Sequence, residues 1–244
     1  MRLRVTKAHA YGNDFLFVAE ELLAGSAVER PALARLVLAA READIRRSAL
    51  GKLTDQSLMV VIAIEAKQAD VGRALIAKLV DQVGLARIAI EAAEPNVRLA
   101  ATERITDQLV LAGIATKDTD TKVRLAAIER LTDPSVLTRI AGEDQDPHNR
   151  RAALRSDVDQ SVARKIAVED ADAGVRAAAV ARISDQGLLR TIALGDPEQA
   201  VRYAAVWRLG DQEALGRIAL EDNDALVRKT AFSRITELAG VDGP

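Results

Sequence analysis

Residues 172–193 read DAGVRAAAVARISDQGLLRTIA, and this stretch decides the fold. Its apolar residues have the spacing of two amphipathic helices, each of about ten residues. The first helix would bury Val175, Ala178, Ala179 and Ile183, and the second would bury Leu188, Leu189, Ile192 and Ala193. Asp185 directly precedes the second helix, where its carboxylate can accept hydrogen bonds from unpaired backbone N–H groups. The stretch therefore predicts a helical hairpin with a capped second helix.

This pattern recurs with a constant interval of 26 residues. Asp185 has counterparts at positions 55, 81, 107, 133, 159 and 211, and Ile192 has counterparts at 62, 88, 114, 140, 166 and 218. The residues expected to begin the first helices are Gln68, Glu94, Asp120, Asp146, Asp172, Glu198 and Asp224. A single hairpin cannot bury its apolar stripe, so each hairpin must pack against the next. The sequence therefore predicts an all-α fold, an α-solenoid of stacked antiparallel helix pairs.

The period also sets the expected domain boundaries. Seven hairpins would span roughly 42–223, and residues 224–238 would add one more first helix, so that the solenoid covers 42–238. Residues 28–41 fall in frame with a degenerate second helix, which we expect to cap the N-terminal side. Residues 239–244 are expected to be a disordered tail.

The composition fits this fold and excludes several classes of function. Of the 244 residues, 49% are hydrophobic but only 2% are aromatic, which favours closely packed helices of Ala, Leu, Ile and Val. The absence of Cys excludes disulfides, thiolate metal sites and cysteine nucleophiles. A net charge of -2 argues against a general nucleic-acid binder. Because no apolar run reaches the ~18–20 residues of a membrane span, we expect a cytoplasmic monomer without membrane contact.

The motif Val-Arg-x-Ala-Ala, as at residues 175–179, resembles the short bacterial version of the HEAT/armadillo repeats. The resemblance covers about four-fifths of the chain, although the unit is shorter than the usual ~40 residues. The chain is also similar to the leucine-rich-repeat variant family, in which one element is a short 3₁₀ turn, but this motif is long enough for a full α-helix. The HEAT resemblance implies a non-catalytic protein interaction scaffold whose second helices line a concave surface. Some HEAT-like proteins instead act on DNA as alkyl-base glycosylases or handle tetrapyrroles as bilin lyases.

Residues 5–18 break the period and carry two short β-prone runs around Tyr11-Gly12-Asn13-Asp14, which predicts a β-hairpin-like segment within residues 1–27. Within it, KAHAYGNDF at residues 7–15 resembles the opening motif of diaminopimelate epimerase. That resemblance implies that Asn13 would help to hold an amino-acid substrate. The chemistry needs two cysteines as an acid/base pair, and the chain has none, so we expect a remnant without epimerase activity.

An arginine recurs on the first helices and could bind phosphate groups. It occupies positions 46, 98, 124, 150, 176, 202 and 228, and Gly72 is the exception. Carboxylates lie near the C-terminal ends of the preceding helices at Glu91, Glu143, Glu169 and Glu221, with Asp118, Asp170, Asp196 and Asp222 adjacent to those ends. Both charges stand at the unfavourable end of a helix dipole, so we expect them to neutralise each other in an Arg–carboxylate ladder between repeats.

Two candidate binding surfaces remain. One is a set of cations on the second helices, Arg87, Arg139, Arg164, Lys165, Arg190 and Arg217. The same four glutamates could pair with these cations at i,i+4, and otherwise the surface suits an acidic protein or peptide partner. The other is the aromatic pair Tyr203 and Trp207, which either forms a contact patch or packs on a neighbouring helix.

No motif indicates catalysis. The chain has two His, no phosphate-binding glycine loop and no nucleophile elbow. The acidic segments 143–148 and 170–174 lack the ligand set of a zinc or calcium site. We therefore expect neither a metal, nor a cofactor, nor enzymatic activity.

One repeat departs from the others. Asn149 replaces a core Val, and Asp157 replaces the core Leu or Ile. Because a buried unpaired carboxylate costs several kcal/mol, we expect a shortened or rotated first helix that turns Val158 inward. The segment around 150–158 should then be less stable than its neighbours.

Overall fold

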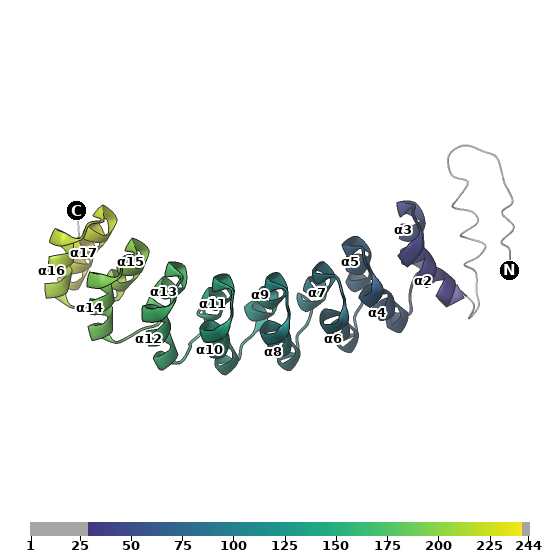
Figure 1. The fold of residues 1–244 in the computed structure, drawn as a ribbon, viewed down its shortest axis with the longest axis horizontal. Helices are drawn as coiled ribbons and strands as arrows, with labels where there is room; N and C mark the ends of the chain where they lie inside the picture. The colour runs from purple at the N-terminus through teal and green to yellow at the C-terminus, as the bar shows by residue number, and fades with distance from the viewer. Residues whose placement is uncertain (1–28, 241–244) are drawn as a thin grey trace. The chain divides into compact units, whose positions relative to one another are not determined.

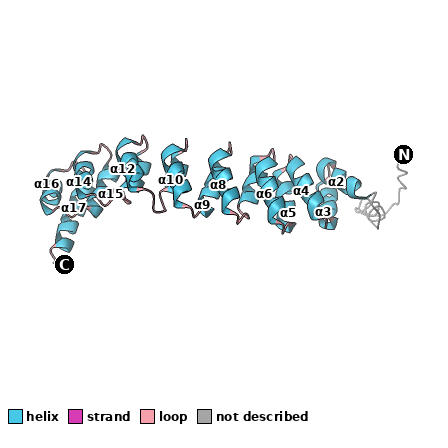
Figure 2. Ribbon diagram, turned by 90° about the horizontal axis from the view of Figure 1, so that it is seen from below, coloured by secondary structure: helices cyan, strands magenta, loops and turns pink. Residues whose placement is uncertain are grey.

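The computed structural model describes residues 29–240, and all regular secondary structure in that range is helical (Figure 2). The β-hairpin expected within residues 1–27, with its resemblance to an epimerase segment, lies outside the described residues. So do residues 241–244 of the expected tail. None of the described helices is long and apolar enough to cross a membrane.

The helices follow one another with the expected spacing, and the chain divides into two compact units between Val110 and Leu111. The first unit contains α2 (Glu29–Ala39), α3 (Ala43–Lys52), α4 (Gln56–Glu65), α5 (Ala69–Lys78), α6 (Gln82–Glu91) and α7 (Pro95–Thr102) (Figure 1). Helix α8 (Gln108–Lys117) begins in the first unit and crosses the division. The second unit continues with α9 (Thr121–Arg130), α10 (Pro134–Glu143), α11 (Pro147–Ala153), α12 (Gln160–Glu169), α13 (Ala173–Val180), α14 (Gln186–Gly195), α15 (Gln199–Arg208), α16 (Gln212–Glu221) and α17 (Ala225–Leu238).

The recurrent Asp begins the even-numbered helices from α4 onward, which correspond to the second helices of the sequence pattern. Asp133 accepts hydrogen bonds from the backbone N–H groups of Ser135 (2.8 Å) and Val136 (3.4 Å). Its counterparts at 55, 81, 107, 159, 185 and 211 cap their helices in the same way. Among the odd-numbered helices, Asp120, Asp146, Asp172 and Asp224 supply a side-chain cap, whereas Gln68, Glu94 and Glu198 do not.

The closest helix pairs show that the hairpins have a different phase from the one expected. By phase we mean which of its two neighbours along the chain a helix pairs with. Apart from α8, the even-numbered helices pack most closely on the odd-numbered helix that follows them, as in α4 with α5, α14 with α15 and α16 with α17. The sequence pattern paired each odd-numbered helix with the even-numbered helix after it. In the structure, α17 therefore completes a hairpin with α16 and is not an unpaired last helix. Likewise, α2 forms a hairpin with α3, whereas residues 28–41 were expected to form only a cap.

A recurrent glutamine explains this phase. The first residue of α14, Gln186, donates from Nε2 to the carbonyl of Arg208 (3.2 Å) and accepts from the N–H of Gly210 (2.8 Å). These bonds tie the start of α14 to the end of α15. Gln56 and Gln82 make the same pair of bonds around the ends of α5 and α7. The glutamine thus closes a hairpin of an even-numbered helix and the next odd-numbered one.

Within residues 111–240 the two rows of helices are packed differently. Neighbouring odd-numbered helices, from α9 to α17, pack closely on one another, while α10 with α12 and α14 with α16 are much less closely packed. The even-numbered helices therefore form the more open side of this unit. The HEAT resemblance implies a concave surface on that side, and the packing within this unit does not agree with it.

In residues 29–110 the even-numbered helices approach each other more closely, and a glycine explains why. A Cβ atom on Gly84 would lie 2.6 Å from Cγ2 of Val60, so α6 packs directly against α4 at this point. Gly72, which replaces the recurrent Arg, has equally little space because the side chain of Val97 fills it. Close backbone approach thus replaces polar side chains at these junctions.

The irregular repeat has the expected local structure. Helix α11 is seven residues long, Asp157 is exposed and Val158 is 6% exposed, so the shortened helix and the inward turn of Val158 are confirmed. Asn149 is fully buried. Its Nδ2 lies 3.3 Å from both carboxylate oxygens of Asp144, while its Oδ1 has no hydrogen-bond partner among the described residues.

Candidate functional site

Four recurrent arginines of the second unit form the expected ladder, while Arg228 donates to backbone carbonyls. Arg150 donates from Nε and Nη2 to the two carboxylate oxygens of Asp170, both at 2.7 Å, and the two side chains are 14% and 8% exposed. The same bidentate pair joins Arg124 to Asp144, Arg176 to Asp196 and Arg202 to Asp222. The partner is in each case the Asp that follows an even-numbered helix, so the ladder leaves the neighbouring glutamates available to other cations.

Each ladder arginine also binds the end of its own hairpin. Nη1 of Arg150 donates to the carbonyls of Asp144 (2.9 Å) and Gln145 (3.2 Å), where the backbone leaves α10. A cation is favourable at the C-terminal end of a helix dipole, which offsets the unfavourable end noted from the sequence. The hydrogen bond to Asp170 raises the pKa of Arg150. Burial works to raise the pKa of Asp170, but the hydrogen bonds from Arg150 and from the N–H of Asp172 lower it overall.

A second polar link between hairpins was missed in the sequence. At the ends of α5, α7, α11, α13, α15 and α17, a cation donates to terminal carbonyls of the preceding odd-numbered helix within the same unit. Arg182 donates from Nε to the carbonyl of Leu154 (2.7 Å), and Lys78 donates from Nζ to that of Leu53 (2.6 Å). The available signal was a Lys or Arg at positions 52, 78, 104, 130, 182, 208 and 234. Because the acceptors are carbonyls, no partner side chain in the sequence marks this link.

The cations expected on the even-numbered helices fall into two groups. Those with a carboxylate partner are Arg87 with Glu91 (3.1 Å), Arg217 with Glu221 (2.8 Å), Arg190 with Asp211 (3.0 Å) and Arg164 with Asp185 (3.8 Å). Arg139 and Lys165 form no ion pair with any described residue. The i,i+4 pairs therefore form in α6 and α16 but not in α10 and α12.

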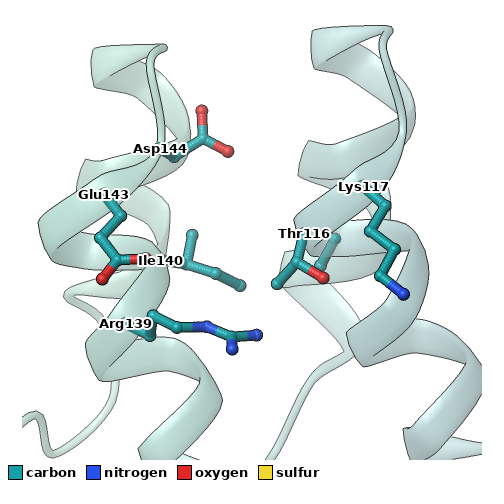
Figure 3. A pocket seen from close by; sticks show the side chains of 7 residues that line it. Thr116, Lys117, Arg139, Ile140, Glu143 and Asp144 are labelled. Carbon is teal, nitrogen blue, oxygen red and sulfur yellow. The ribbon is translucent and has the colours of Figure 1, made fainter.

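The two unpaired cations line one groove between α10 and α12. This cavity of about 490 Å³ is also lined by Ser135, Thr138, Gly142 and Val162, and by Glu143 and Glu169. Arg139 also borders a cavity of about 370 Å³ between α8 and α10, together with Lys117. Figure 3 shows Arg139 and Ile140 extending from α10 toward Thr116 of α8. Arg139 thus stands on the wall that separates two neighbouring grooves.

The aromatic candidates lie on the other row of helices. Tyr203 and Trp207 stand on α15 with their ring centroids 6.3 Å apart and nearly perpendicular, and Trp207 is 43% exposed. The structure therefore does not bring them together with Arg139 and Lys165. The basic set and the aromatic pair are separate surfaces.

These features define the class of the protein as a tandem repeat of paired helices held together by recurrent polar links. No protein-family model matches the chain, and no curated protein matches it.

Proposed function

We propose that the chain is a non-catalytic binding module of the HEAT/armadillo type, which takes a protein or peptide partner with acidic side chains on its even-numbered helices. The observation that carries the proposal is the groove between α10 and α12, where Arg139 and Lys165 have no carboxylate partner. The chain has two His and no Cys, which supports binding over catalysis.

These cations are available at little energetic cost. An exposed i,i+4 ion pair contributes only about 0.2–0.5 kcal/mol, so the helices do not depend on pairs at these two positions. Asp170 also lines the groove, but its carboxylate oxygens are held by the bidentate pair with Arg150, and those of Asp144 by Arg124. A carboxylate from a partner would meet Arg139 and Lys165 between two helices, where hydrogen bonds to charged groups are stronger than on an open surface.

The charges and hydroxyls of the groove also favour one side for the path of an acidic segment of the partner. Glu143 and Glu169 stand one turn further toward the C-terminal ends of α10 and α12 and would repel carboxylates there. On the other side, the hydroxyl of Thr138 accepts a hydrogen bond from the N–H of Asp159 (3.2 Å). Its own O–H can then donate to a partner. We infer that the segment crosses the helices on the side of Ser135 and Thr138.

A pair of charge-matched variants tests this site. Fluorescein-labelled glutamate-rich peptides would be titrated with the full chain, and binding would be followed by fluorescence anisotropy at low and high salt. The double variant Arg139→Ala with Lys165→Ala is expected to weaken binding by about tenfold, equivalent to ~1.4 kcal/mol. The double variant Arg87→Ala with Arg217→Ala removes the same charge from paired positions and should change binding less than about twofold.

Equal losses in the two double variants would mean that only the net charge of the protein matters. No binding of acidic peptides by the unmodified chain at low salt would refute the proposal outright.

A further inference from the structure

Among the described residues, the aromatic pair on α15 has one other exposed aromatic side chain in its row of helices, Phe232 on α17. Trp207 is the single Trp of the chain and is 43% exposed, and Tyr203 is half-buried against it. The position of Trp207 is held in other repeats by Gly51, Ala77, Glu103, Glu129, Arg155, Ala181 and Ser233. A Trp exposed at a position where core packing does not require it is typical of a contact residue.

The neighbouring helix leaves the face of this pair unobstructed. On α13, which packs against α15, Ala177 and Ala181 hold the positions that Tyr203 and Trp207 hold on α15. An apolar side chain from a partner could therefore rest against the Trp207 ring without meeting a long side chain from α13. This small apolar area, formed by Tyr203, Trp207, Ala177 and Ala181, is called the aromatic patch below.

A cation stands on either side of the aromatic patch. Arg151 extends from α11 to the start of α13, where a Cβ atom on Gly174 would lie 3.6 Å from its Nη1. Lys229 occupies on α17 the position of Tyr203 on α15. Both side chains are exposed, and neither forms an ion pair with a described residue. The acidic Glu237 of α17 is already paired with Arg234 (2.9 Å).

We propose that this face of α11, α13, α15 and α17 binds an extended peptide that carries one large apolar side chain between two carboxylates. The apolar side chain would contact Trp207, and the carboxylates would pair with Arg151 and Lys229. With helix axes ~9 Å apart, the three steps from α11 to α17 span about 27 Å. An extended chain covers that length in about eight residues. The apolar residue would lie about three residues from the acid that meets Lys229, since α15 is one helix away from α17.

Trp207 itself reports on this site, because no other Trp contributes to the emission of the protein. The probes are nine-residue peptides without Trp or Tyr, with Glu at both ends and Leu three residues from one end, and Gly and Ser elsewhere. Both sequence directions are used. We expect a blue shift of the Trp emission, protection from acrylamide quenching, and an affinity that falls at least threefold between low and moderate salt.

Matched variants separate this face from general effects. Ala181→Glu places a carboxylate in the aromatic patch and should weaken peptide binding at least tenfold. Ala77→Glu makes the same change at the same position of α5 and should leave binding unchanged. Reversal of Arg151 or Lys229 to Glu should each weaken binding several-fold. The double variant Arg139→Ala with Lys165→Ala should retain the Trp response, so failure of the groove proposed above would not affect this test.

Three outcomes would overturn the proposal. The first is an unchanged Trp emission at millimolar peptide, and the second is an equal loss in the Ala77→Glu and Ala181→Glu variants. The third is a stronger response to a single-stranded oligonucleotide than to the acidic peptides, which would indicate base stacking on Trp207 instead.

Discussion

Replacement of Asn149 by Val is expected to stabilise the protein. Asn149 is fully buried at a position where the other odd-numbered helices carry a buried Val, as at Val123 and Val175. Its Oδ1 has no partner within residues 29–240, and a buried acceptor without a hydrogen bond costs about 1–3 kcal/mol. The substitution removes that atom and places a methyl group in an apolar site, for a further gain of ~0.8 kcal/mol.

The substitution also removes the hydrogen bonds of Nδ2. Those bonds are long, 3.3 Å to each oxygen of Asp144 and 3.5 Å to the carbonyl of Thr121, so we expect their loss to cost about 1.5 kcal/mol, the lower end for hydrogen bonds to a charged group. Asp144 keeps its bidentate pair with Arg124 and its bond from the N–H of Asp146. The net expectation is a gain of about 1 kcal/mol, or a rise of ~2–4 °C in the unfolding midpoint for a chain of this length.

Thermal and urea unfolding followed by circular dichroism would measure this difference. Asn149→Ala is the control, because it removes the same amide but leaves a cavity, and it should be ~1–2 kcal/mol less stable than Asn149→Val. Unfolding of Asn149→Val at a lower urea concentration than the unmodified protein would contradict this expectation. That result would mean that the bonds from the amide to Asp144 outweigh the unsatisfied Oδ1.

Three further predictions concern the ladder and the irregular repeat. Asp170→Asn should destabilise the protein by about 2–3 kcal/mol, and a double-mutant cycle with Arg150→Met should give a coupling of at least 1 kcal/mol, whereas additivity would show that the pair is energetically unimportant. The lowered pKa values of Asp144, Asp170 and Asp222 mean that their contribution to stability is complete above the ordinary Asp pKa of 3.8 and is lost as the pH falls through the lower folded-state values. The stability difference between the unmodified protein and Asp170→Asn should therefore shrink from pH 5 to pH 2, and a constant difference would contradict this origin. Amide hydrogen exchange should be faster at 150–158 than in the matching segment 176–184, and equal protection would remove the expected weak segment.

Much of the fold followed from the sequence because one residue type does one physical task in every repeat. The Asp that recurs every 26 residues marks the helix starts, since its short carboxylate can reach the N–H groups of the first turn. The Arg column indicated the ladder, since unpaired guanidinium groups near helix starts need carboxylates. The exposure of Asp157 and the inward turn of Val158 followed from the cost of burying an unpaired carboxylate.

The phase of the hairpins did not follow, because both ways of pairing the helices bury the same apolar positions. What distinguishes them is the bond from Gln186 to the backbone of the next helix end, and a backbone acceptor leaves no pattern of its own. The same holds for Arg182 and its counterparts, which bind carbonyls. Which cations stay unpaired was also not predictable, since Arg87 and Arg139 have the same i,i+4 glutamate and only one of them uses it.

The junctions between hairpins have a consequence for how such an array can change by duplication. Asp144 and its counterparts occupy positions that Ala66 and Ala92 hold nearer the N-terminus. If a hairpin from the last third of the chain were inserted before the hairpin that contains Ala92, its arginine would have no Asp partner in the following hairpin. Duplication is therefore compatible with this protein only between hairpins that carry the same residue type at this position. Hairpins that carry the Asp cannot replace those that carry Ala66 or Ala92 without loss of an ion pair.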